Sequence, residues 1–309
     1  MGRRNRKGDP VHGWFVIDKP EGYTSTKIVA IVKRLSNAAK AGHAGTLDPM
    51  ATGILPIAMG EATKTIPYVV DSTKEYEFTV AWGTATATDD REGDMVATSD
   101  NRPDRSAIEK IIPAFVGSIE QTPPAFSAIK IGGKRAYALA RKGEEVVLKP
   151  RTIEIYELDL IDMPDRDHAR FRVVSGAGAY MRALARDMAV ALDTVGHLIK
   201  LRRTRVGPFS LDTSILLDEL QGFGHIAAVL ECLLPIETAL DDIPALALSG
   251  IEASRLRNGQ SVSLLRKGDL ERVATLSEGD TVLAMDRGKL VALTEYYAGE
   301  VRPFRVLNL

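Results

Sequence analysis

One segment near the N-terminus, GHAGTLDPMATGILP at residues 42–56, constrains the backbone more than any other part of the chain. It contains three glycines and two prolines. Glycine permits backbone angles that other residues avoid, while proline fixes φ and removes a hydrogen-bond donor. Pro49 also moves the preceding Asp48 away from helical geometry. The pattern therefore predicts neither a helix nor a central strand, but a rigid, extended or turning backbone that holds Asp48.

Asp48 has two interpretations on local grounds. An aspartate before a proline is ordinary turn chemistry, because its side chain can hydrogen-bond its own backbone two residues on. A carboxylate fixed on a rigid loop also suits a cleft into which it must project. His43, in the same segment, is open to the same choice between a packed or solvated histidine and a site residue.

The composition indicates an ordinary globular protein: 309 residues, 45 % hydrophobic and 26 % charged, enough for one large domain with an appendage or for two domains. No apolar run approaches the length of a membrane span, and no apolar segment follows the basic N-terminus as in a secretory signal. The single cysteine, Cys232, excludes an internal disulfide framework and fits a reducing cytoplasm. The chain has no metal-ligand spacing, so we expect no zinc site.

The net charge of −1 does not by itself indicate a nucleic-acid-binding protein, yet the charge is uneven. Residues 130–142 hold five basic side chains and residues 200–205 hold four, and neither run contains an acidic one. Each run alone is typical of a solvated helix or loop face. Together they favour a local phosphate-binding surface, since phosphate contacts need a basic patch rather than a basic protein.

Strands and helices are predicted without regular alternation. Apolar or alternating segments predict strands, and amphipathic segments predict helices. Strands are expected at residues 12–18, 75–82, 152–160 and 168–174, and helices at 27–35, 60–70, 105–115, 135–141 and 180–192. Strand hairpins with inserted helices favour an α+β fold with a mixed or antiparallel sheet over a doubly wound parallel fold.

The chain is expected to divide near residue 240. Residues 235–244 begin and end with proline and contain the turn pair Asp241-Asp242. A helix is then expected from residue 250, and two strands follow that are joined by the hairpin signal Asp286-Arg287-Gly288. We therefore expect a large domain over residues 1–240 and a small β-rich domain over 241–309.

Five motifs, in order along nearly the whole chain, resemble those of one enzyme family. The segment at 42–56 resembles the catalytic motif of the TruB-type pseudouridine synthases. The resemblance extends to VIDKP and GYTS at 16–25, KEY at 74–76, GAYMRALARD at 178–187 and LRRTRVGPF at 201–209. The tail, with LRNGQ at 256–260, is similar to the small PUA-like RNA-binding domain of many members. Ala44 and the pair Val174-Ser175 depart from the family pattern, but neither removes a group that carries the reaction.

The resemblance implies an isomerase that converts uridine 55 in the T loop of tRNA into pseudouridine. The reaction breaks the C1′–N1 bond, rotates the uracil and rejoins it through C5, so it needs neither a cofactor nor a metal. It needs one ionised carboxylate beside C1′, and the family gives this role to Asp48. Two routes stay open: covalent addition of Asp48 to C1′, and removal of the C2′ proton to give a glycal.

The family motifs also assign roles to other side chains. Arg182 is expected to pair with Asp48, because a cationic partner favours the charged form of a buried carboxylate. Tyr76, the third catalytic residue, is expected to stack on the target base. The expected substrate-binding residues are His43 in the space that the flipped base vacates, Tyr180 beside Asp48, Leu201 in the uracil pocket, and Lys19 and Lys64 at phosphates. Each has a plain structural alternative as a core, strand or surface residue.

The expected partner is the T-arm stem-loop of tRNA, bound by shape and phosphate contacts once the base is extruded. We expect a cytoplasmic monomer with no membrane contact and no obligate protein partner. One alternative is the guide-RNA-dependent branch of the same superfamily, which shares the aspartate motif but usually carries long basic extensions. A second alternative is a non-catalytic RNA-binding or RNA-folding module, which would not require the full set of motif residues.

Overall fold

The computed structural model describes residues 8–127, 130–131, 134–137, 146–265 and 267–309. The basic residues 1–7, most of the helix predicted over 135–141 and much of the basic run at 130–142 lie outside the described residues. Within the described part, no helix is long and apolar enough to cross a membrane.

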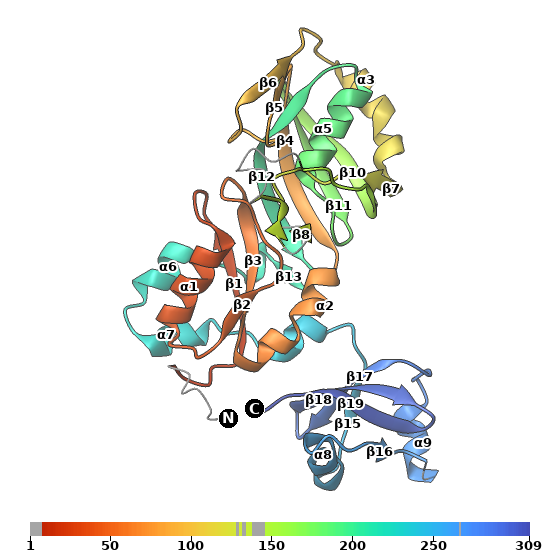
Figure 1. Ribbon diagram of the computed structural model, residues 1–309. Coiled ribbons are helices and arrows are strands. Elements are labelled where there is room, and N and C mark those ends of the chain that lie inside the picture. The colour runs from red at the N-terminus through yellow and green to blue at the C-terminus, as the bar shows by residue number, and fades with distance from the viewer. Residues whose placement is uncertain (1–7, 128–129, 132–133, 138–145, 266) are drawn as a thin grey trace.

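Among the described residues, ten strands form one mixed sheet in the larger, N-terminal part of the chain (Figure 1). Its main path runs β14-β1-β3-β12-β4-β11-β10-β7, while β2 pairs with β3 and β13 with β12. Most neighbours are antiparallel, but β1–β14 and β3–β12 are parallel. The strands are β1 (Gly13–Lys19), β2 (Ala41–His43), β3 (Thr52–Met59), β4 (Lys74–Trp82), β7 (Gly117–Gln121), β10 (Arg151–Asp165), β11 (His168–Ser175), β12 (Gly196–Val206), β13 (Phe209–Ser210) and β14 (Ile215–Leu216). The predicted α+β fold with a mixed sheet is confirmed.

Helices lie beside both ends of this sheet. Figure 1 shows α1, α6 and α7 near β1, and α3 and α5 near β10 and β11. The α-helices are α1 (Ser25–Leu35), α2 (Ile66–Asp71), α3 (Arg105–Ile111), α5 (Met181–Ala191), α6 (Leu217–Gly222) and α7 (Ile226–Glu231). The 3₁₀ turns are η1 (Gly60–Lys64), η2 (Ile112–Phe115), η3 (Leu211–Thr213) and η4 (Ile236–Leu240), and two small hairpins pair β5 (Thr84–Thr86) with β6 (Met95–Thr98) and β8 (Lys130–Ile131) with β9 (Lys134–Arg135).

Local sequence explains the two helices that border the site. At the start of α1 the Thr24 hydroxyl accepts the backbone N–H of Lys27 at 3.2 Å, which is a side-chain N-cap. In α5, Met181, Leu184 and Met188 recur at helical spacing and are at most 4 % exposed, so this stripe faces the core as predicted. The helix predicted over 60–70 is instead η1 followed by α2, because proline is favoured at the start of the second helix and not inside one helix.

The segment at residues 42–56 departs from the prediction in its second half. Asp48 lies on a non-helical loop, as expected, but β3 begins at Thr52 and lies between β1 and β12, in the middle of the sheet. Pro56 is tolerated there because its carbonyl accepts the Ala44 N–H at 2.9 Å, on the side of the short strand β2. The N–H and C=O of one residue in an antiparallel strand point the same way, so the missing donor leaves the pairing with β1 intact.

Half of the basic run at residues 200–205 does not form a solvated face, although Lys200 and Arg205 are exposed. The run forms the second half of β12, a strand between β3 and β4. Arg203 is 2 % exposed, and Arg202 pairs with Asp18 at 2.6 Å. Two of the four charges are therefore used inside the sheet, which the charge pattern alone could not indicate.

A second, five-stranded sheet forms the C-terminal part of the chain, in the order β15-β17-β18-β19-β16. Its apolar face and the helix α8 enclose a separate hydrophobic cluster. The elements are β15 (Ala245–Ala247), α8 (Gly250–Arg257), β16 (Val262–Ser263), η5 (Lys267–Asp269), α9 (Leu270–Val273), β17 (Thr281–Asp286), β18 (Lys289–Tyr297) and β19 (Glu300–Val306). The small β-rich tail is confirmed, while the PUA-like assignment and the boundary after residue 240 stay predictions.

The two sheets share a hydrophobic cluster. Trp14, Phe209 and Leu240 from the N-terminal part belong to the same buried cluster as Leu283 and Leu293 from the C-terminal sheet, and each is at most 5 % exposed. A shared core of this kind restricts the relative movement of the two parts more than a flexible linker would, because separating them would expose apolar surface to water.

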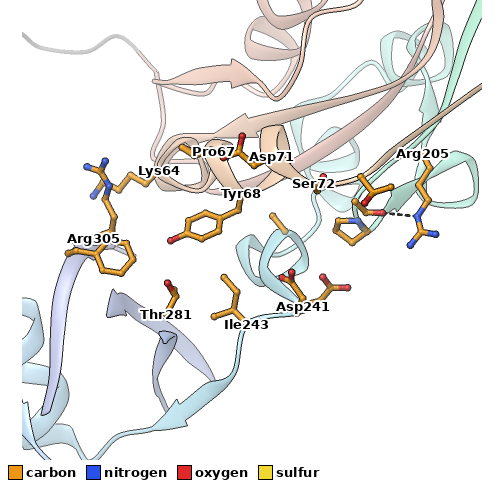
Figure 2. A pocket seen from close by; sticks show the side chains of 16 residues that line it. Lys64, Pro67, Tyr68, Asp71, Ser72, Arg205, Asp241, Ile243, Thr281 and Arg305 are labelled. Carbon is orange, nitrogen blue, oxygen red and sulfur yellow. Dashed lines mark hydrogen bonds between the residues drawn. The ribbon is translucent and has the colours of Figure 1, made fainter. Parts of the chain in front are cut away.

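A groove of about 1010 Å³ lies beside this shared cluster (Figure 2). On one wall Lys64 donates a hydrogen bond to the Val306 carbonyl at 2.6 Å, which ties η1 to β19. Tyr68 points into the groove, and the N–H of Asn308 donates to the Glu61 carboxylate at 2.9 Å. Polar contacts therefore reinforce the apolar junction.

We predict that a chain ending at residue 240 is markedly less stable than the full chain. The truncation exposes apolar side chains of the shared cluster, each of which stabilises the folded state by about 1.5–3 kcal/mol when fully buried. The midpoint of thermal unfolding, followed by circular dichroism, should fall by about 10 °C or more. As a control, Ile251→Ala changes a side chain that is 79 % exposed on the C-terminal part and should leave the midpoint unchanged. An unchanged midpoint in the truncated chain would mean that the cluster does not couple the two parts.

Candidate active site

A buried hydroxyl fixes the loop that carries Asp48. Ser25, at the start of α1, accepts a hydrogen bond from the N–H of Leu47 at 2.8 Å and donates one to the Leu47 carbonyl at 3.0 Å. One side chain therefore satisfies both backbone groups of Leu47, the residue before Asp48. The N–H of Gly22 donates to the carbonyl of Pro49 at 2.8 Å on the other side. The backbone is thus held immediately before and after Asp48.

Lys19 is part of the same support. Its side chain is fully buried, and its ammonium donates to the carbonyls of Pro20, Tyr23 and Pro49 at 3.0, 2.8 and 3.2 Å. Burial lowers the pKa of this ammonium to about 8, while the nearby Asp48 carboxylate acts in the opposite direction. The predicted phosphate contact of Lys19 is therefore corrected, because all three donors are used inside the protein and no surface is left for a phosphate.

Arg182 pairs with Asp48, as predicted. Its Nε lies 3.0 Å from Oδ2 of Asp48, and its Nη1 lies 3.5 Å from Oδ2 of Asp90. The same guanidinium donates to the carbonyls of Thr88 and Phe126 at 3.0 and 2.9 Å. The Arg182 side chain is 6 % exposed and that of Asp48 is 35 % exposed. The Arg182 guanidinium is thus fixed by backbone carbonyls, while the Asp48 carboxylate remains open to a ligand.

Opposing effects act on the Asp48 carboxyl. Burial raises its pKa above the ordinary value, and the negative charge of Asp90 adds to this effect. The cations of Arg182 and Lys19 lower the pKa, but burial is the larger cause, and the net direction is upward. The carboxyl is therefore a stronger base than an ordinary aspartate, which suits attack on carbon or acceptance of a proton.

Tyr180 is placed beside this pair through its backbone. Its N–H donates to Oε1 of Gln121 at 2.8 Å, and its carbonyl accepts from Nε2 of Gln121 at 3.2 Å. Burial raises the pKa of the Tyr180 phenol, and the positive charges of Arg151 and Arg182 oppose that rise. The Asp48 charge also acts on this phenol, so the two predicted site residues are electrostatic neighbours.

Tyr76 and Leu201 lie on the adjacent strands β4 and β12. Leu201 is 8 % exposed and stands opposite Phe78, so it is a core residue of the sheet. Tyr76 is half-buried and stands opposite Arg203. The phenol of Tyr76 acts electrostatically on the buried Arg203 guanidinium.

The remaining two predicted contacts both lie toward the C-terminal end of β3. His43 is half-buried on β2, opposite Ile57. Lys64 follows the far end of β3, where it pairs with Glu61 at 2.5 Å and faces the C-terminal sheet. Since a strand advances about 3.3 Å per residue, the length of β3 separates Lys64 from the Asp48 loop.

Several residues that build the site were not singled out from the sequence. They are Ser25, Asp90, Gln121 and Arg203, and each is at most 3 % exposed. Two of them lay inside motifs that carry the family resemblance, which was the available signal for them. Nothing in the local pattern distinguished the other two from ordinary turn and strand residues, because their partners are distant in sequence.

Comparison with protein families assigns most of the chain. Residues 33–181 match the model described as TruB family pseudouridylate synthase (N terminal domain). Residues 182–241 match the model described as tRNA pseudouridylate synthase B C-terminal domain. The chain is 53 % identical to tRNA pseudouridine synthase B of Rhodospirillum rubrum over 99 % of each chain, and 52 % identical to the protein of that name from Caulobacter vibrioides, again over 99 % of each.

Solved structures agree at the level of the fold. A chain in the crystal structure of a Cbf5-Nop10-Gar1 complex is 25 % identical, with a TM-score of 0.71, over 98 % of this chain and 91 % of that one. A chain in the structure of an H/ACA RNP bound to a substrate RNA containing 2′-deoxyuridine has a TM-score of 0.73 at 23 % identity, over 100 % and 92 %.

The family model and the named relatives thus define an isomerase that forms pseudouridine. Within that class, two family models match the chain, and about half of all positions are identical to those of the named relatives. The chain belongs to the TruB family of pseudouridylate synthases.

We predict that Ser25→Ala loosens the Asp48 loop. The change leaves a buried N–H and a buried carbonyl of Leu47 without their partner, which costs about 1–3 kcal/mol in the free energy of unfolding. Urea unfolding should measure this loss. The neighbouring Thr26→Ala, at an exposed position of the same helix turn, should change the free energy by less than about 0.5 kcal/mol. Equal stabilities for the two variants would contradict the anchoring role of Ser25.

Proposed function

We infer that this protein converts uridine 55 in the T loop of tRNA into pseudouridine. The relatives that cover 99 % of the chain are named tRNA pseudouridine synthase B. The observation that carries the chemistry is the 3.0 Å pair between Asp48 and Arg182, which gives one carboxylate on a supported loop a cation of its own. A reaction that only breaks and remakes a glycosidic bond needs such a carboxylate near C1′.

In the proposed reaction Asp48 acts at the sugar. It either adds to C1′, with the uracil leaving through N1, or removes the C2′ proton to give a glycal. The freed uracil turns and its C5 forms a bond to C1′, which displaces Asp48 in the first route and is accompanied by return of the proton to C2′ in the second. Loss of the C5 proton and protonation of N1 complete pseudouridine. Arg182 favours the ionised form of Asp48 throughout, because opposite charges at 3.0 Å offset part of the effect of burial.

The target uridine must leave the stack before Asp48 can reach C1′. We propose that Tyr76 stacks on the flipped uracil and that Leu201 forms the apolar wall of its pocket, since both lie on neighbouring strands of one sheet. Tyr180 packs beside the carboxylate, and its nearness to Asp48 supports this role. His43 occupies the space that the base leaves behind.

The T arm is proposed to extend from the Asp48 loop toward the C-terminal sheet. Lys64 stays a candidate phosphate contact, since it lies with Arg205 and Arg305 in the groove between the two parts. The C-terminal sheet would hold RNA by shape and phosphate contacts, as a PUA-like domain does. We propose that the protein acts in the cytoplasm as a monomer, without a protein partner.

A guide-RNA-dependent activity is the second candidate, because one structural neighbour comes from an H/ACA RNP bound to a substrate RNA. The closer likeness in sequence is to the tRNA enzymes, at 53 % against 23 % identity. A bare T-arm stem-loop distinguishes the two candidates, since a guide-dependent enzyme would leave it unmodified.

We predict that Asp48→Asn abolishes product formation and retains RNA binding. The amide keeps the shape of the side chain but can neither attack C1′ nor take a proton, so single-turnover rates should fall by at least about 10³-fold. Pseudouridine at position 55 is mapped chemically in a T-arm stem-loop, and affinity is measured by filter binding.

The control for this variant is Asp159→Asn, which neutralises a carboxylate that is 64 % exposed on β10. It should leave both the rate and the affinity within about two-fold of the unmodified protein. Turnover of Asp48→Asn at a comparable rate would remove Asp48 from the mechanism, and modification at a uridine other than 55 would refute the proposed target.

We predict that the acidic limb of the kcat/KM profile reflects Asp48. The ionised carboxylate is the active form, and its pKa is raised above the ordinary 3.8, so activity should fall, as the pH is lowered, at a higher pH than for an ordinary aspartate. Arg182→Gln removes a cation that lowers this pKa and should move the limb to still higher pH. A limb that stays in place in that variant would assign the titration to another group.

A further inference from the structure

Arg203 is a buried cation to which the proposed chemistry gives no role. Its guanidinium donates from Nε to the carbonyl of Ile54 at 2.8 Å and from Nη2 to the carbonyl of Gly45 at 3.0 Å. It also stands opposite Tyr76 across the two strands, and the phenol of Tyr76 acts on it electrostatically. These partners are two backbone carbonyls and a phenol, not a carboxylate. Burying a cation among neutral groups costs stability, which indicates a purpose other than packing.

The partners of Arg203 belong to two parts of the proposed site. On β12, Arg203 stands directly opposite Tyr76 on β4, and such pairs place their Cβ atoms about 4.5–5.5 Å apart. Gly45 lies three residues before Asp48, on the loop that carries it. One rigid, planar side chain therefore connects the strand of the phenol to the loop of the carboxylate.

The backbone around Arg203 is packed too closely to shift. Gly53 on β3 has a φ of +99°, and a Cβ there would lie 2.1 Å from the carbonyl oxygen of Arg203. Gly45 has a φ of +95°, and a Cβ there would lie 3.2 Å from Nη1 of Arg203. Both positions need the conformational freedom of glycine. The loop and β3 thus approach Arg203 as closely as a peptide backbone can.

We propose that Arg203 is a positioning residue for the isomerisation, which sets the separation between the Asp48 loop and the side chain of Tyr76. The inference rests on the proposed roles of Asp48 and Tyr76. A displacement of about 1 Å at a reacting centre can cost about 10²-fold in rate. Arg203 itself is buried away from the RNA, so its loss should lower kcat and leave KM nearly unchanged.

The first test compares Arg203→Lys with Arg202→Gln. Lysine keeps the positive charge but replaces the planar fork by one ammonium, which cannot hold all three partners in the same geometry. Single-turnover rates on a T-arm stem-loop should fall by at least about 10-fold, with KM within about three-fold. Arg202 is the matched control, since it also links strands, through Asp18 at 2.6 Å, but contacts neither Tyr76 nor the Asp48 loop.

Arg202→Gln should keep kcat within about two-fold of the unmodified protein even if it unfolds at a lower temperature. A normal kcat in Arg203→Lys, or an equal loss in Arg202→Gln, overturns the inference. If Asp48→Asn is inactive while Arg203→Lys is fully active, the inference fails and the proposed function stands. Activity in Asp48→Asn contradicts the proposed function itself.

A double-mutant cycle separates positioning from general stability. If Arg203 acts through the Tyr76 hydroxyl, the loss caused by Arg203→Lys should be smaller in a Tyr76→Phe background than in the unmodified protein. Multiplicative losses would mean that the two side chains act independently and would overturn the inference.

The pair can also be tested if Arg203→Lys does not fold. Tyr76→Phe removes the phenol oxygen that acts electrostatically on the buried guanidinium, so the unfolding temperature should fall. Tyr156→Phe, at a tyrosine that is 53 % exposed on β10, should not lower it. Equal unfolding temperatures for these two variants would overturn the link between Arg203 and Tyr76.

Discussion

The site depends on one buried guanidinium that favours the charged form of a partly buried carboxylate. Arg182 lies 3.0 Å from Asp48, yet burial still raises the pKa of that carboxyl. The balance requires the cation to stay in place, and carbonyls on either side of it, at Thr88 and Phe126, accept its remaining donors. The turn after β5, the start of α5 and the segment after β7 are arranged around this single side chain. Replacing Arg182 would therefore disturb three segments as well as one charge.

The loop that carries Asp48 is rigid because its polar groups are satisfied inside the protein. Ser25 hydrogen-bonds both the N–H and the carbonyl of Leu47. Lys19 donates to the carbonyl of Pro49, and Arg203 donates to the carbonyl of Gly45. Two of these three supports are cations, which are costly to bury but bind carbonyls strongly. A fully satisfied polar network specifies one arrangement, whereas an apolar core tolerates small repacking. Holding a nucleophile beside a sugar requires a single arrangement of the loop more than it requires tolerance of repacking.

The sequence predicted what depends on local pattern, including α1, α5, the strands around Tyr76 and the hairpin of the C-terminal sheet. The pairing of Asp48 with Arg182 came from the family resemblance and is confirmed as geometry. Local pattern failed where the outcome depends on partners far along the chain. Basic residues in β12 resembled a solvated face, since no local rule indicates that Arg203 lies opposite Tyr76. Lys19 resembled a phosphate contact for the same reason, because the carbonyls that bury it belong to a turn and a distant loop.

The shared cluster at the junction also changes what the C-terminal sheet can do. A tail on a flexible linker would add affinity by remaining near the RNA, whatever its orientation. Here Leu283 and Leu293 are buried in one cluster with Trp14 and Phe209, so the tail is held at a set distance from the sheet that carries Asp48. In the proposed complex an RNA that contacts both parts must then match that distance as well as present a uridine. Rigid spacing selects the shape of a folded arm, which is the property by which helical RNA is usually recognised. The apolar junction, far from the chemistry, would in this way contribute to the choice of substrate.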